Sequence, residues 1–101
     1  MSERIKFRYF SPVSEVQNYI RTKVVEITRF APYDSRLSTA VTKLKESYAC
    51  QILVRSKAGA FRTLVTGPNP QSAIESAHTK IMEQLKKWKH QRFAPTLAYP
   101  L

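Results

Sequence analysis

Basic and apolar side chains alternate in residues 4–9, which read Arg-Ile-Lys-Phe-Arg-Tyr. Because successive side chains of a β-strand point to opposite faces, this pattern predicts a strand with one basic and one apolar face. The basic face would carry Arg4, Lys6 and Arg8, and the apolar face Ile5, Phe7 and Tyr9. Like charges side by side repel one another unless an anion faces them, and the phosphates of nucleic acid are such anions. The spacing therefore predicts a phosphate-binding surface.

Basic residues also recur at helical spacings in two later segments. Arg21 and Arg29 are eight residues apart, so they lie on one side of their helix, as do Lys80 and Lys87, seven apart, in the second. Lys23 falls in the apolar sector of its helix, so its stem is also suited to covering the edge of the core. For any one lysine near a helix C-terminus, a favourable interaction with the helix dipole explains the position equally well. The candidate phosphate contacts are Arg4, Lys6, Arg8, Arg21, Lys23, Arg29, Lys80, Lys86, Lys87, Lys89, His90 and Arg92.

The overall charge supports a polyanionic partner. The chain has 17 Lys and Arg residues against 7 Asp and Glu, a net charge of +10 and a pI of about 10.1. Hydrophobic residues make up 43% of its 101 residues, which argues against a disordered basic tail. We expect one folded domain over residues 1–92, followed by an apolar, proline-containing tail at 93–101. No apolar stretch approaches the roughly 18 residues that span a bilayer, and no signal peptide is apparent, so an intracellular protein is expected.

The residues that could support catalysis are few. Cys50 lies within a predicted strand on its apolar face, where a core thiol is more common than a nucleophile. His78 lies at the edge of an apolar stripe and His90 among lysines, and neither joins a Ser-His-acid arrangement. The chain's two glycines, Gly59 and Gly67, do not form a phosphate-cradling loop. We therefore predict no catalytic site, no metal site, no cofactor and no small-molecule substrate.

Apolar periodicity predicts the elements that position the basic residues. Ser14 is a candidate N-cap for the first helix and Asn69 for the second, which begins with proline. A short hairpin connection contains Gly59, which can adopt a positive φ. The predicted elements are a strand at 3–10, a helix at 14–29, strands at 36–46, 47–56 and 61–66, and a helix at 70–92.

The element order is β-α-β-β-β-α. Short links imply antiparallel pairing of the last three strands, while the helix after the first strand allows parallel pairing. We predict an α+β two-layer sandwich, with a four-stranded mixed sheet and two helices packed on one face. The other face of the sheet is then free to be polar.

Specific residues of both helical segments match a known family. In the first helix they are Tyr19-Ile20, Lys23, Val24, Ile27 and Arg29-Phe30, and in the second Ala73-Ile74 and the run from Lys80 through Glu83 to His90. These residues resemble the ribosome hibernation-promoting factor family, also called ribosome-associated inhibitor or sigma-modulation proteins. The resemblance covers residues 4–92 and is to the short, single-domain members. It implies RNA-binding roles for the basic residues that match basic positions of the family, which are Lys23, Arg29, Lys86, Lys87 and Lys89. The chain departs from the family at Pro70-Gln71-Ser72, where an acidic and tyrosine-containing segment is usual, and in its apolar tail.

The resemblance implies a fold like that of double-stranded RNA-binding domains. It also implies binding to the small ribosomal subunit, in the channel between head and body, through ribosomal RNA. There the protein would occlude messenger and transfer RNA positions and hold idle ribosomes inactive. This family likeness implies a cytoplasmic, non-catalytic factor. It also implies that the protein is a monomer off the ribosome and does not bind membranes.

Two alternative functions remain open from the sequence. One is a general binder of double-stranded or structured RNA, and the other a basic protein-interaction module that uses the tail at 93–101. Exposed Tyr9, Tyr33 or Phe10 could stack on a base, although packing explains such aromatic residues more often.

Overall fold

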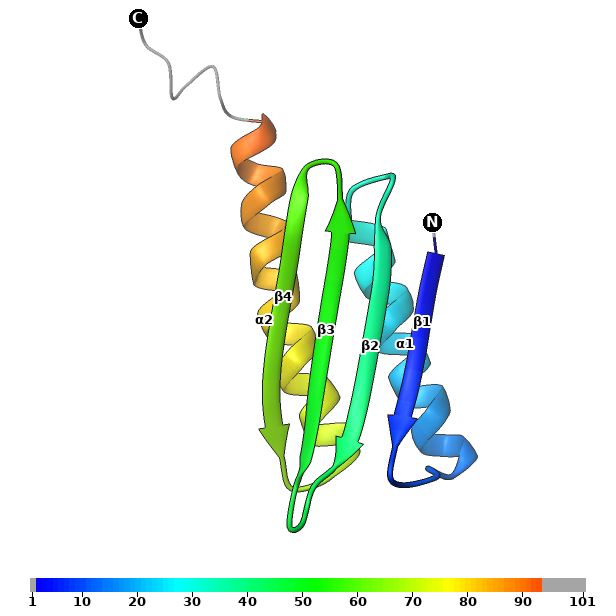
Figure 1. Ribbon diagram of the computed structural model, residues 1–101. Coiled ribbons are helices and arrows are strands. Elements are labelled where there is room, and N and C mark those ends of the chain that lie inside the picture. The colour runs from blue at the N-terminus through cyan, green and yellow to red at the C-terminus, as the bar shows by residue number, and fades with distance from the viewer. Residues whose placement is uncertain (1, 94–101) are drawn as a thin grey trace, which may run out of the picture.

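The computed structural model describes residues 2–93, with side chains from residue 4 to residue 91 (Figure 1). Six elements follow one another in the predicted order β-α-β-β-β-α. They are β1 (Ser2–Arg8), α1 (Ser14–Phe30), β2 (Arg36–Lys43), β3 (Tyr48–Ser56), β4 (Gly59–Gly67) and α2 (Pro70–Phe93). Apart from the backbone of Phe93, the last residue of α2, the predicted tail at 93–101 lies outside the described residues.

The four strands form one sheet in the order β1-β2-β3-β4. β1 pairs with β2 in parallel, because α1 lies between them in the chain, whereas β2, β3 and β4 pair antiparallel through short connections. Figure 1 shows both helices on one face of the sheet, with α1 behind β1 and β2 and α2 behind β3 and β4. The predicted two-layer α+β fold is confirmed, and no described element covers the other face of the sheet.

The core lies between the sheet and the two helices. Residues three and four apart along α1 bury one stripe, and alternate residues of each strand point toward it. This alternation sends the intervening strand residues to the open face of the sheet. The fully or almost fully buried core residues are Ile20, Val24, Ile27, Leu37, Val41, Cys50, Ile52, Val54, Ala73, Ile74, Ala77, Ile81, Met82 and Leu85.

The connections on either side of β4 use the predicted turn residues. Gly59 adopts a φ of +132° in the β3–β4 hairpin, a conformation that L side chains rarely take. Asn69 caps α2, because its Oδ1 accepts a hydrogen bond of 2.8 Å from the backbone N–H of Ser72. The backbones of β4 and α2 also approach each other closely at Gly67, where a Cβ atom would lie 2.9 Å from the backbone nitrogen of Ala73.

The prediction that Tyr9 continues the apolar face of β1 is wrong. β1 ends at Arg8, and Tyr9 has a φ of 68° and is 84% exposed. A residue in this left-handed conformation turns the chain out of the strand before α1 begins. Phe10 packs in its place, with its ring centre 5.8 Å from that of Phe7 and 5.1 Å from that of Tyr48.

Several predicted boundaries also differ. β4, predicted at 61–66, runs from Gly59 to Gly67 and so includes two residues of the predicted hairpin connection. Ser14 is not the N-cap of α1 but its first residue; the capping position is Val13, which makes no side-chain cap hydrogen bond. The side-chain amide of Gln17 instead donates to the carbonyl oxygen of Pro12 at 2.9 Å. β2 ends at Lys43 rather than at residue 46, because the backbone N–H of Leu44 bonds back to the carbonyl oxygen of Ser47 in a turn.

Candidate nucleic-acid interface

The open face of the sheet carries the basic row predicted for β1. Arg4, Lys6 and Arg8 are exposed, whereas Ile5 and Phe7 pack against the core. Side chains two residues apart along a strand are separated by about 6.6 Å, so the three cations of the row are spaced at about that distance along β1. The predicted basic face of this strand is therefore present and faces solvent.

Three arginines that the sequence analysis did not place in the interface join this row. Arg36 of β2, Arg55 of β3 and Arg62 of β4 are all exposed, and each lies next to a residue that points into the core. The alternation in 47–56 already predicts that Arg55 faces away from the apolar side. Only the pairing register shows that it lies directly opposite Arg36.

On the other side of the molecule, the two helices meet at Phe30, the last residue of α1. The Nζ atoms of Lys86 and Lys89 lie 5.6 Å and 5.2 Å from the centre of its ring. Both distances are in the range of cation–π attraction, which holds these ammonium groups beside the end of α1. Two predicted phosphate ligands of α2 are thereby positioned by a residue of α1.

Lys23 of α1 extends this group of cations. It is half-buried, as its apolar sector predicts, and its Nζ lies 5.5 Å from the centre of the Tyr19 ring. Its charge and that of Lys86 both act on His78, so the three groups are near one another. We call the cations Lys23, Lys86 and Lys89 the helix seam.

Burial, together with the charges of the seam, keeps His78 neutral. Burial lowers the pKa of His78 below its usual 6.5, and the charges of Lys23 and Lys86 lower it further. Glu26 opposes this effect, with its Oε2 3.2 Å from His78 Nε2, although among the described residues that nitrogen has no hydrogen-bond partner. The imidazole is therefore neutral at pH 7 and adds no charge to the seam.

Arg21 and Arg29 lie together on α1, as their spacing predicts. Both are exposed and line one shallow hollow, which they share with Glu26. These arginines offer planar donors that match phosphate, but a carboxylate lies in the same hollow.

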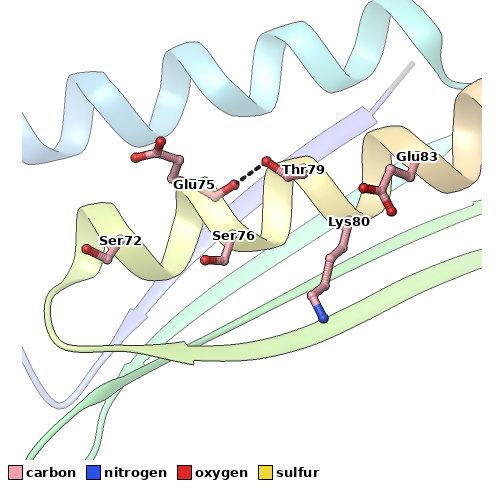
Figure 2. A pocket seen from close by; sticks show the side chains of 6 residues that line it. All are labelled: Ser72, Glu75, Ser76, Thr79, Lys80 and Glu83. Carbon is pink, nitrogen blue, oxygen red and sulfur yellow. Dashed lines mark hydrogen bonds between the residues drawn. The ribbon is translucent and has the colours of Figure 1, made fainter.

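Lys80 is separated from the helix seam and lies among acidic side chains (Figure 2). It lines a hollow with Glu75 and Glu83, so two carboxylates accompany one ammonium group. Figure 2 shows Glu75 turned toward α1, where its Oε2 accepts a hydrogen bond of 3.4 Å from the Tyr19 hydroxyl, and Lys80 turned away from α1. This arrangement is unfavourable for a phosphate at Lys80.

The remaining predicted residues of α2 lie near its C-terminal end. Lys87 and His90 are exposed. Arg92 belongs to the helix, but its side chain lies outside the described residues. Of the three aromatic residues considered for base stacking, Tyr9 and Tyr33 are exposed, whereas Phe10 packs against Phe7 and Tyr48.

The basic groups are not neutralised within the molecule. Among side chains 4–91, no Lys or Arg forms an ion pair with Asp or Glu, and the one contact at ion-pair distance joins Glu26 to His78, whose imidazole is neutral at pH 7. The described strand residues from Arg4 to Gly67 include no Asp or Glu. The cations are therefore available to an anionic partner.

The structure also describes the groups considered for other chemistry. Cys50 is fully buried, and burial raises its pKa to about 12, so it is a thiol rather than a reactive thiolate at neutral pH. Over side chains 4–91 no group of His, Cys, Asp and Glu is arranged to hold a metal ion. None of the described helices combines the length and apolar character that a membrane crossing requires.

Comparison with known proteins supplies the context for these surfaces. Residues 4–92 match the model of a family described as Sigma 54 modulation protein / S30EA ribosomal protein. No curated protein sequence matches the chain.

Two solved structures share the fold. The Protein Y N-terminal domain of Thermus thermophilus is 17% identical with a TM-score of 0.73, and the match covers 87% of this chain and 99% of that one. A ribosomal subunit interface protein from Coxiella burnetii is 12% identical with a TM-score of 0.73, over 89% of this chain and 99% of that one.

Proposed function

Since this chain belongs to the Sigma 54 modulation protein / S30EA ribosomal protein family, we propose that it binds the small ribosomal subunit and inhibits translation without catalysing a reaction. Ribosomal RNA is its partner on the subunit. The bound domain occludes positions that messenger and transfer RNA would occupy. Off the ribosome it is a monomer.

The observation that carries this proposal is the helix seam. Lys86 and Lys89 are held over Phe30, and the charges of Lys86 and Lys23 both act on His78. None of the three lysines forms an ion pair with a carboxylate among the described residues. Grouped cations of this kind bind backbone phosphates and release the counterions condensed on them. The binding is therefore electrostatic, and the inhibition is steric.

Co-sedimentation with isolated small ribosomal subunits over a salt series tests this function. If about six phosphates are neutralised, the logarithm of the binding constant falls with the logarithm of salt concentration with a slope of about −4 to −5. We expect near-stoichiometric binding that survives an excess of duplex RNA. Binding that the duplex removes would contradict the proposal and indicate a general binder of structured RNA instead.

A pair of matched variants localises the binding surface. Lys86→Gln with Lys89→Gln removes two charges from the seam, both of which lie over the Phe30 ring. The control is Lys43→Gln with Lys45→Gln, since the Nζ of Lys43 lies 4.9 Å from the centre of the Tyr48 ring. Both double variants change the net charge equally, and we expect only the seam variant to weaken association with the subunit.

Charge reversal gives the stronger form of this test. Lys86, Lys87 and Lys89 changed together to Glu are expected to abolish association while the far-UV circular dichroism stays that of the unaltered protein. A folded triple variant that still co-sediments would exclude the seam as the binding surface.

A further inference from the structure

The open face of the sheet, which includes the predicted basic row of β1, is a second positive surface, separate from the helix seam. Among side chains 4–91, the helices that form the seam also contain four carboxylates, whereas the strand residues from Arg4 to Gly67 contain none. The sheet face is thus the more uniformly positive of the two surfaces. Its exposed cations are Arg4, Lys6, Arg8, Arg36, Arg55 and Arg62.

Two of these cations face each other directly. Arg36 and Arg55 are register partners in the antiparallel pair of β2 and β3. Like charges opposite each other destabilise a strand pair, and among the described residues no carboxylate forms an ion pair with either arginine. An anionic ligand on this face would relieve that repulsion.

The face also has a shape that suits an extended anion. Ser38 and Ala40 are small residues of β2, and the longer side chains of Arg4 and Lys6 stand beside them on β1. A shallow hollow lies between the β1 row and Gln51 of β3, with Ser38 and Ala40 in its lining. A second hollow shares Arg4, Ser38 and Leu53 with the first and continues to Arg36 and Arg55. Together they form a basic trough along β2.

The chemistry of the trough favours phosphates over bases. Four of the five cations that line it are arginines, whose planar guanidinium groups bind phosphate oxygens in pairs. The aromatic residues of the described strands, Phe7, Tyr48 and Phe61, pack against the core, so none of them offers a stacking platform on this face. A ligand held in this way is recognised by its backbone and not by its sequence.

An acidic protein is a poorer match for the same face. Protein interfaces have an apolar centre surrounded by a polar rim. Here the two large apolar side chains are Leu53 of β3, which is half-buried in the trough, and Leu64 of β4, which is 69% exposed and lies away from the β1 row. They do not form an exposed apolar centre of the kind that a protein partner would cover. The regular row of cations along β1 suits the repeating charge of a nucleic acid strand.

We propose that this open sheet face binds the sugar–phosphate backbone of a second RNA segment, so that the domain bridges two segments of RNA. The helices and the open face lie on opposite sides of the molecule, so one RNA segment would not obstruct the other (Figure 1). This inference rests on the proposed function for the first of the two contacts, at the helix seam.

Three double variants with equal charge loss separate the surfaces. Arg36→Gln with Arg55→Gln alters the sheet face, Lys86→Gln with Lys89→Gln the seam, and Lys43→Gln with Lys45→Gln serves as the control. The sheet variant is expected to fold at least as stably as the unaltered protein, because it removes a pair of facing like charges. Arg36→Lys with Arg55→Lys keeps the charge and removes only the paired donors.

The measurement is a bridging assay with the full chain. One RNA hairpin is immobilised, the protein is bound to it, and capture of a second, labelled copy of the hairpin is recorded. We expect capture by the unaltered protein and the control, and loss of capture by the sheet variant and by the seam variant, each of which still binds the immobilised hairpin. The sheet variant should also lower the salt slope for single-stranded RNA by about 1.4, for two lost phosphate contacts.

The possible outcomes decide between clear alternatives. Absence of capture by the unaltered protein, or a sheet variant that behaves like the control, would overturn the proposal. Capture retained by both variants would indicate protein dimers and would also overturn it. If the sheet variant binds RNA normally but loses a ribosomal protein in co-sedimentation, the face binds protein instead. If bridging is seen but small subunits are not bound, the second RNA surface stands and the proposed function fails.

Discussion

The Nζ atom of Lys89 lies 5.2 Å from the centre of the Phe30 ring, so the end of α2 is positioned by the last residue of α1. Lys86, one turn earlier in α2, approaches the same ring at 5.6 Å. Phe30 also packs against the core. The position of these cations therefore depends on how the two helices pack, and the packing of the core is linked to the orientation of the proposed binding surface.

This ring contact should be measurable as a coupling energy. We expect Phe30→Leu and Lys89→Gln to show a coupling of about 0.5–1 kcal/mol in a double-mutant cycle of urea unfolding, which is typical of an exposed cation–π pair. The same cycle with Lys87→Gln is the control, since Lys87 makes no described contact with the ring. Equal coupling in both cycles would contradict a specific role for Lys89.

Gly67 is expected to resist substitution. A Cβ atom there would lie 2.9 Å from the backbone nitrogen of Ala73, and backbone atoms cannot rotate away as a flexible side chain would. We expect Gly67→Ala to lower the free energy of unfolding by about 1–3 kcal/mol through overpacking. Thr66→Ala, at the exposed neighbouring position, should have little effect, and equal stability of the two variants in urea would refute this account.

The stability of the protein should decrease in mild acid because of His78. The folded state lowers the pKa of His78 from 6.5, by burial and by the charges of Lys23 and Lys86. As the pH falls below about 6.5, the unfolded chain therefore binds the proton first, and unfolding becomes more favourable.

Urea unfolding at pH 7.5 and pH 5.5 measures this effect. His78→Gln should show a smaller loss of stability between the two pH values, because glutamine does not titrate. A variant with the same pH dependence as the unaltered protein would show that His78 does not cause the loss.

Cys50 is expected to be unreactive in the folded protein. Its side chain is fully buried, and its pKa is raised to about 12. A thiol-reactive aromatic disulfide at neutral pH should therefore label Cys50 of the folded protein only as fast as the fold opens around it. The same reagent should label the urea-unfolded protein rapidly. Because the chain has a single cysteine, the signal has one source. Immediate labelling without urea would contradict this burial.

Cys50 also implies a loss of stability in alkali. The raised pKa of the buried thiol means that its contribution to stability is fully present below pH 9 and is lost as the pH rises toward 12. Cys50→Ala should reduce this dependence, which urea unfolding at alkaline pH would measure. An unchanged dependence would assign the alkaline loss to other groups.

Local patterns in the sequence were enough to determine the element order, the two-layer fold and the basic row on β1. The periods of two in a strand and of about 3.6 in a helix come from the geometry of the backbone itself, so the alternation around Lys6 can be recognised without knowledge of the rest of the chain. The capping by Asn69 is equally local, because it joins residues three apart. The left-handed conformation of Tyr9 was not predictable in this way, because it depends on where the chain must turn so that Phe10 can pack against Phe7 and Tyr48.

The tertiary structure decided which basic residues lie together. Strand register, a long-range property, places Arg36 opposite Arg55, and helix packing brings Lys86 to Phe30. The same packing leaves Lys80 beside Glu75 and Glu83, although its helical spacing from Lys87 suggested a shared surface. Sequence alone determines the face of an element on which a charge lies. Which charges of different elements share a surface depends on pairing and packing between residues far apart in the chain.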